Sequence, residues 1–159
     1  MNFILNATKF SLYDIVICDK KRNIVIDGTF SKIIYSNEFV VMNAIYINIP
    51  LISLTLIKSE DEVYLQYNPA NPTNARIIQD FIKIEYQILD YYTKCNNIHS
   101  NIITSLTKRL QSGKFKISNI SETDTSEQFS VMLKISGIWE TSNEIGLASK
   151  FIPVKQLQY

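Results

Sequence analysis

The sequence predicts one α+β domain, mostly β, in which an antiparallel barrel carries two helices inserted between its halves. Short apolar runs separated by turn residues occupy about residues 12–67 and again about 114–154, which is typical of strands. Between them, about residues 73–111 follow the helical spacing of apolar side chains. With 159 residues, 46% of them hydrophobic, the chain suffices for one core, so we expect a single domain over residues 1–159.

The first half predicts a series of short strands bounded by turns. The polar cluster Asp19–Asn23 is typical of a hairpin turn, Asp27-Gly28 is a strong turn dipeptide, and Pro50 ends or bends a strand. The strands are expected at residues 12–18, 24–26, 30–35, 39–49, 51–58 and 63–67.

The middle of the chain predicts two helices. Thr73 is expected to cap the first, whose apolar side chains recur at helical spacing from Ile77 to Tyr92. The second is expected from about Ile98 to Gln111, with Ser112-Gly113 as its stop.

The last third predicts strands over residues 114–120, 129–138 and 145–154, the last two forming a hairpin. Alternation places Lys134 on one face of the first hairpin strand and Trp139 on the other, while a bulge at Gly137 would re-aim the indole ring. Lys134 and Lys150 are expected on the solvent side of paired strands and Phe151 in the core, while Trp139 is open to either a core position or an exposed one.

Composition excludes several classes of protein. The net charge of +1 argues against binding duplex DNA by bulk electrostatics, so nucleic-acid binding would need a local patch and aromatic rings. No apolar run is long enough to span a membrane. Two cysteines indicate a reducing compartment, and the N-terminal residues lack the basic start and apolar core of a signal peptide.

Catalysis has little support in the sequence, and we expect no enzyme activity, no catalytic residues, no metal and no cofactor. His99, the only histidine, follows Cys95 by four residues, but neither a nucleophilic pair nor a metal site finds its remaining partners nearby. The four glycines form no phosphate-binding loop. Carboxylates lie mostly in turns, where solvated loops are the ordinary explanation.

The C-terminal hairpin carries a resemblance. The run Lys-Ile-Ser-Gly-Ile-Trp-Glu-Thr (134–141), a short polar gap and then Ile-Gly-Leu-Ala-Ser-Lys-Phe (145–151) resembles the C-terminal strand pair of small virus-encoded single-stranded DNA-binding proteins. The resemblance implies an OB-like barrel and sequence-independent binding of single-stranded DNA in viral replication or recombination, inside the infected host cell. It places Lys134, Trp139 and Lys150 on the binding face.

Four further residues are weaker candidates for that nucleic-acid surface: Lys21 and Arg22 at a basic hairpin tip, and Lys114 and Lys116, which alternate with apolar residues. RNA remains open as a ligand in place of DNA, and a homo-oligomer is an open possibility by analogy with other small barrels. Two other functions also stay open: a viral structural or protein-interaction module that binds no nucleic acid, and a small hydrolase that uses loop carboxylates with a divalent metal.

Overall fold

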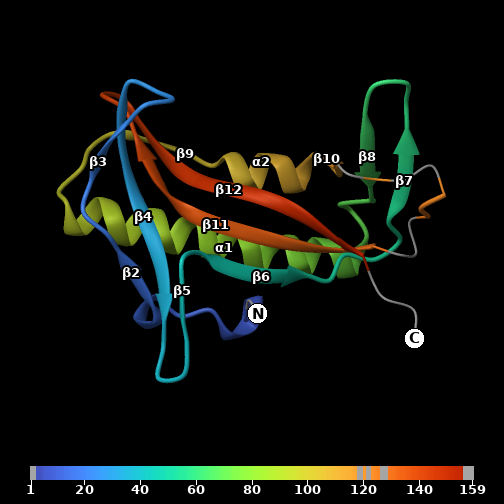
Figure 1. The fold of residues 1–159 in the computed structure, drawn as a ribbon, viewed down its shortest axis with the longest axis horizontal. Helices are drawn as coiled ribbons and strands as arrows, with labels where there is room; N and C mark the ends of the chain where they lie inside the picture. The colour runs from blue at the N-terminus through green and yellow to red at the C-terminus, as the bar shows by residue number, and fades with distance from the viewer. Residues whose placement is uncertain (1–2, 118–119, 121–122, 126–128, 156–159) are drawn as a thin grey trace.

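The computed structural model describes residues 3–117, 120, 123–125 and 129–155. Over these residues the fold is α+β and mostly β, as predicted, with a nine-stranded sheet, a three-stranded sheet and two α-helices (Figure 1). The expected antiparallel barrel is not closed, because both sheets are open. The strands at the two ends of the main path through the large sheet, β1 (Leu5–Asn6) and β9 (Asn101–Ile103), do not pair with each other.

The large sheet is built on the long antiparallel hairpin of β11 (Phe129–Glu140) and β12 (Glu144–Lys155), which confirms the strongest hairpin prediction. The other side of β11 pairs first with β6 (Ile45–Ile49) and then with β4 (Gly28–Ser36). β4 also pairs with three short strands: β2 (Ile15–Ile17), β3 (Lys21–Asn23) and β5 (Val41–Met42). Two parallel pairs, β1 with β6 and β9 with β12, complete the sheet.

The small antiparallel sheet has the order β10 (Lys114–Ile117), β8 (Val63–Gln66) and β7 (Thr55–Lys58). It joins the large sheet through stacked rings, since Phe115 of β10 lies 4.6 Å from Phe151 of β12 between ring centroids. Both rings are buried, as was expected for Phe151.

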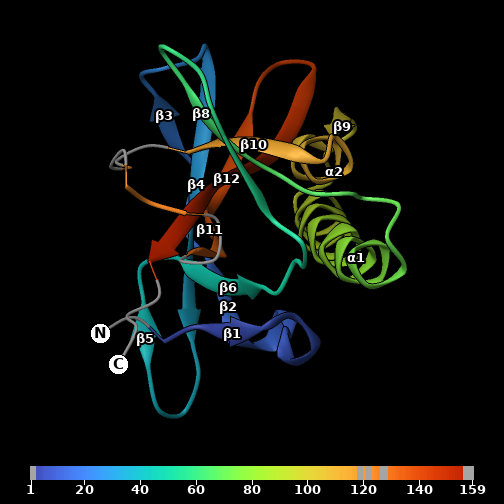
Figure 2. The same ribbon diagram turned by 90° about the vertical axis from the view of Figure 1, so that its right-hand side faces the viewer.

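The helices α1 (Pro72–Cys95) and α2 (Ser105–Gln111) lie on one side of the large sheet (Figure 2). The N-cap of α1 lies two residues earlier than predicted, because the side chain of Asn71, and not that of Thr73, accepts the first free backbone N–H groups. Its buried side contains Ile78, Phe81, Ile84, Ile88, Leu89 and Tyr92. Among the described helices, none has the length and apolarity needed to cross a membrane.

The second helix is much shorter than predicted. Residues 101–103 form β9 instead. Their backbone N–H and C=O groups find hydrogen-bond partners in the sheet by pairing with residues 144–146 of β12. α2 therefore starts at Ser105, and the predicted stop is confirmed: Gly113 follows the helix with φ of 75°. Thr104 makes no side-chain cap. The buried Glu85 of α1 replaces it by accepting hydrogen bonds from the N–H groups of Leu106 and Thr107 at 3.0 and 2.9 Å.

The hairpin between β3 and β4 is shifted from its predicted register. The polar residues Lys21–Asn23, expected in the turn, form β3, and residues 24–27, expected to begin with a strand, form the turn. β3 pairs with the first residues of β4, so pairing outweighs the β propensity of Ile24, whose side chain is left 98% exposed. The predicted strand at 12–18 also begins late, after a 3-10 turn at Leu12–Asp14.

Candidate nucleic-acid interface

The two faces of the large sheet are different. One packs against α1 and α2, and in Figure 1 the strands cross in front of α1, so that the opposite face is turned toward the viewer. We call this opposite face the helix-free face. On the four central strands it is made by alternate residues: Phe30, Lys32 and Ile34 of β4, Tyr46 and Asn48 of β6, Met132, Lys134 and Trp139 of β11, and Ala148, Lys150 and Ile152 of β12.

A β-bulge decides which hairpin residues share this face. The register of β11 and β12 shifts between Ile135 and Gly137, so Ser136 is the additional residue. Past the bulge the alternation is inverted: Ile138 is buried in the core, and Trp139 joins the face that carries Lys134. The prediction of a bulge at this point is confirmed, whereas simple alternation, which places Trp139 on the face opposite Lys134, is wrong beyond the bulge.

Two aromatic rings lie against glycines on the helix-free face. A Cβ atom added to Gly146 would lie 2.4 Å from the indole Cζ2 of Trp139, and one added to Gly137 would lie 2.4 Å from Cζ of Phe30. Phe30 and Trp139 are themselves direct cross-strand partners. Glycine at these two positions lets the rings approach the sheet closely. Both rings line a hollow of about 490 Å³ beside the β3–β4 hairpin, so part of each ring is accessible from outside.

Four lysines lie on the same side of the sheet as these rings. Lys134 and Lys150 are cross-strand partners, and Lys32 pairs with Gly137 on the other side of β11. Lys21 of β3 pairs with Phe30 and therefore shares its side of the sheet. In the described part of the chain, none of the four makes an ion pair.

The contacts that these lysines do make leave their charges uncompensated. The Nζ atom of Lys134 lies 5.8 Å from the ring centroid of Tyr46, and Lys32 donates to the amide oxygen of Asn43 at 3.1 Å. No Asp or Glu belongs to the helix-free face on β4, β6 or β11 as far as these strands are described. The carboxylate of Glu144, at the start of β12, lines the hollow beside Trp139. The face thus combines accessible rings with positive charge.

The remaining predicted residues lie elsewhere. Arg22 is exposed, but it follows Lys21 along β3 and so lies on the other side of that strand. Lys114 and Lys116 are exposed on one side of β10, as their alternation predicted, but that strand belongs to the small sheet. Lys116 is also paired with Glu62 at 2.8 Å, and this contact lowers the pKa of the Glu62 carboxyl.

Sequence reasoning missed Phe30 and Lys32 as members of the site. The run from Phe30 to Ile34 has apolar residues on both sides of the strand, so alternation alone does not separate the core face from the outer one. A signal was present in Gly137 and Gly146, because a glycine inside a strand often marks close approach of another group. Only the pairing of β4 with β11 shows which rings approach them.

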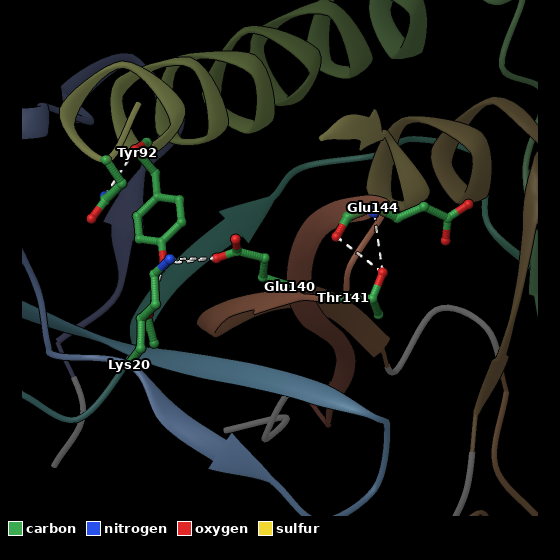
Figure 3. A network of polar contacts seen from close by, with 7 residues as sticks. Lys20, Tyr92, Glu140, Thr141 and Glu144 are labelled. Atoms are coloured by element: carbon green, nitrogen blue, oxygen red, sulfur yellow. Dashed lines mark hydrogen bonds and ion pairs between the residues drawn. The ribbon is translucent and has the colours of Figure 1, made fainter. Parts of the chain in front are cut away.

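On the helix-covered side, the acidic groups are occupied in structural contacts. Glu140 lies 2.9 Å from the Nζ atom of Lys20 and accepts a hydrogen bond from the hydroxyl of Tyr92 at 3.4 Å (Figure 3). The hydroxyl of Tyr92 also lies 3.0 Å from that of the buried Ser31. The bond to Glu140 raises the pKa of Lys20. This network ties the end of α1 to β4 and β11, which is a structural role.

The structure adds no support for metal or nucleophilic chemistry. Among the residues that it describes, no three His, Cys, Asp or Glu side chains gather in a way that could hold a metal ion. Cys95 and His99 are both exposed near the end of α1. Comparisons with protein-family models, with curated proteins and with solved structures each find no match to this chain. The geometry of the helix-free face is therefore the main guide to function.

Proposed function

We propose that this protein binds single-stranded DNA without regard to sequence and without catalysis, using the helix-free face of its large sheet. The observation that carries the proposal is the pair of rings, Phe30 and Trp139, held against glycines among four lysines that have no carboxylate partner. Sequence-independent binding of single strands combines these same elements: rings on which bases stack, and cations that follow the phosphates.

The low net charge of +1 is compatible with this proposal because the charge is distributed unevenly. Carboxylates such as Glu85 and Glu140 are bound on the helix-covered side, while lysines are left free on the other. The proposal needs an open face and does not need a closed barrel. The role in viral DNA replication or recombination, and the location inside an infected cell, depend on the resemblance of the C-terminal hairpin alone.

Titration of fluorescently labelled oligonucleotides, followed by anisotropy, tests the proposal. We expect single strands to bind more tightly than a duplex of the same length. With two to four phosphate contacts, log affinity should fall with log salt at a slope between about −1.4 and −2.8, at about −0.7 per contact. Trp139 is the only tryptophan, so stacking should also quench the intrinsic fluorescence. A slope near zero with no preference for single strands would reject the proposal.

A second candidate is a protein-interaction module, which exposed apolar side chains at two hairpin tips support. Ile24 and Val25 at the β3–β4 tip are 98% and 86% exposed, and Phe39 at the β4–β5 tip is 91% exposed. Such residues are common where proteins associate. Analytical ultracentrifugation separates the two candidates: association that Phe39→Ser abolishes, together with no oligonucleotide binding, favours the interaction module.

A further inference from the structure

A second basic surface lies beside the helix-free face, in a cleft of about 990 Å³ between the two sheets. Its walls include β10, an edge strand of the small sheet, and residues 149–153 of β12. β12 pairs with β9 only over residues 144–146, so beyond them its outer edge has no strand partner among the described residues. The cleft thus lies between two strand edges.

Positive charge dominates this cleft. Five cations line it, against one carboxylate, that of Asp124; the cations are Arg109, Lys114, Lys116, Lys150 and Lys155. Two of the five are neutralised locally, Lys155 by Asp124 at 2.5 Å and Lys116 by Glu62 at 2.8 Å. In the part of the chain that the structure describes, the other three form no ion pair.

Arg109 is held in a fixed orientation at this cleft. Its guanidinium carbon lies 4.8 Å from the ring centroid of Phe151. Nη1 donates to the carbonyl oxygen of Ser149 at 3.3 Å, Nη2 donates to the hydroxyl of the same residue, and Nε donates to the carbonyl oxygen of Ser105 at 3.4 Å. These bonds use three of the five N–H donors, which leaves two.

The nearby carboxylate of Glu85 does not take up the two remaining donors. Its oxygens accept from the backbone of Leu106 and from both the backbone and the hydroxyl of Thr107. A guanidinium that is stacked on a ring and has donors to spare is well suited to binding phosphate. Arg109 is therefore prepared for an anion that enters the cleft.

Lys150 connects the cleft with the helix-free face. It lines the cleft, and it is also the cross-strand partner of Lys134 on that face. The cations consequently continue from β11 over β12 to Lys114 and Arg109. A single strand of nucleic acid is flexible enough to follow this path around the edge of β12, whereas a stiff duplex is not.

We propose that the cleft binds the phosphodiester backbone of the strand whose bases lie on the helix-free face, with Arg109 and Lys114 as its phosphate ligands. This inference rests on the proposed function and extends it, because it assigns a second stretch of nucleotides to a second part of the protein. It also supplies a reason for preferring single strands, since the path turns around a strand edge.

A length series of oligothymidylates, from about 4 to about 16 nucleotides, tests the extended path. The variants are Arg109→Ala and Lys114→Ala, and the matched control is Lys108→Ala, an exposed lysine of α2 that does not line the cleft. We expect both cleft variants to lose about tenfold in affinity for the longest oligonucleotide and almost nothing for the shortest. The control should match the wild type at every length. Lys114 is exposed, so its variant carries the test if Arg109→Ala does not fold.

Other results would overturn the inference in distinguishable ways. If both cleft variants keep the wild-type affinity at all lengths while Trp139→Ala binds more weakly, the cleft does not contact the strand. The proposed function would then still hold. Equal losses at all lengths would place Arg109 in the primary site. A glutamate-rich peptide that binds the wild type but not Arg109→Ala, with oligonucleotide affinity unchanged, would identify a peptide site. Absence of oligonucleotide binding by the wild type would reject the proposed function itself.

Discussion

The two faces of the large sheet use polar groups in opposite ways. On the helix-covered side, Glu85 of α1 accepts three hydrogen bonds from α2, and Glu140 of β11 joins Lys20 to Tyr92. On the helix-free face, Lys134 and Lys150 have no carboxylate partner in the described residues. Buried polar groups must be paired if the fold is to be stable, whereas exposed cations can stay free. The difference indicates that one face maintains the fold and the other is available to a ligand.

The largest expected effect is on the helix-covered face. Glu85→Ala removes the carboxylate that caps α2 and leaves the N–H groups of Leu106 and Thr107 without partners. We expect a loss of about 3 kcal/mol or more in the free energy of unfolding, measured by urea denaturation. The control Glu38→Ala, at an exposed loop position, should change it by less than about 0.5 kcal/mol. A loss below about 1 kcal/mol for Glu85→Ala would contradict the structural role.

The next effect compares one residue from each face of β11. Trp139→Ala should lower affinity for single-stranded DNA by about tenfold or more, since stacking contributes about 1–3 kcal/mol per base. Its partly exposed position on the helix-free face should leave thermal stability little changed. Leu133→Ala, in the core, should show the reverse, with about 2–5 kcal/mol lost in stability and unaltered affinity while folded. The opposite result would be a Trp139→Ala protein that melts early, together with normal DNA binding by the double variant Lys134→Ala with Lys150→Ala. It would mean that the hairpin supports the fold and does not bind DNA.

A charge-matched pair of double variants sharpens the comparison further. Lys134→Ala with Lys150→Ala should weaken binding uniformly across sequences and reduce the salt slope by about 1.4, at about 0.7 for each phosphate contact. Lys83→Ala with Lys94→Ala makes the same change in net charge on exposed positions of α1. Anisotropy at several salt concentrations should show no change in slope for this control. Equal effects of the two double variants would mean that only net charge matters.

The smallest effect appears only in alkaline solution. Burial raises the pKa of Tyr67 to about 12, and its hydroxyl donates to the carbonyl oxygen of Leu110 at 2.6 Å. The neutral phenol is favoured in the folded chain, so this contribution to stability is complete below about pH 10 and is lost as the pH rises through 12. Tyr67→Phe should lose about 1 kcal/mol at neutral pH, yet its stability should fall less steeply between pH 10 and 12. If the unfolding free energies of the wild type and of Tyr67→Phe fall in parallel between pH 10 and 12, burial of the Tyr67 phenol is not the cause.

Local patterns were reliable where backbone partners are close in sequence. The β11–β12 hairpin, the helical period of α1 and the stop at Gly113 follow from alternation, spacing and glycine, all of which act over a few residues. The same reasoning failed at residues 98–104. There the pairing of β9 with β12, over 40 residues away, replaced the expected first turns of a helix.

The sequence by itself determined the α+β class, the two-helix insert and the three strongest candidate residues, Lys134, Trp139 and Lys150. Only the tertiary structure decided that the sheets stay open and that the bulge, expected at Gly137, has Ser136 as its additional residue. It also decided that Phe30 and Lys32 lie on the same face as Lys134 and Trp139, and that Arg109 lies at a cleft. The physical reason is that alternation gives the side of a strand, whereas the partner strand and its register depend on long-range pairing.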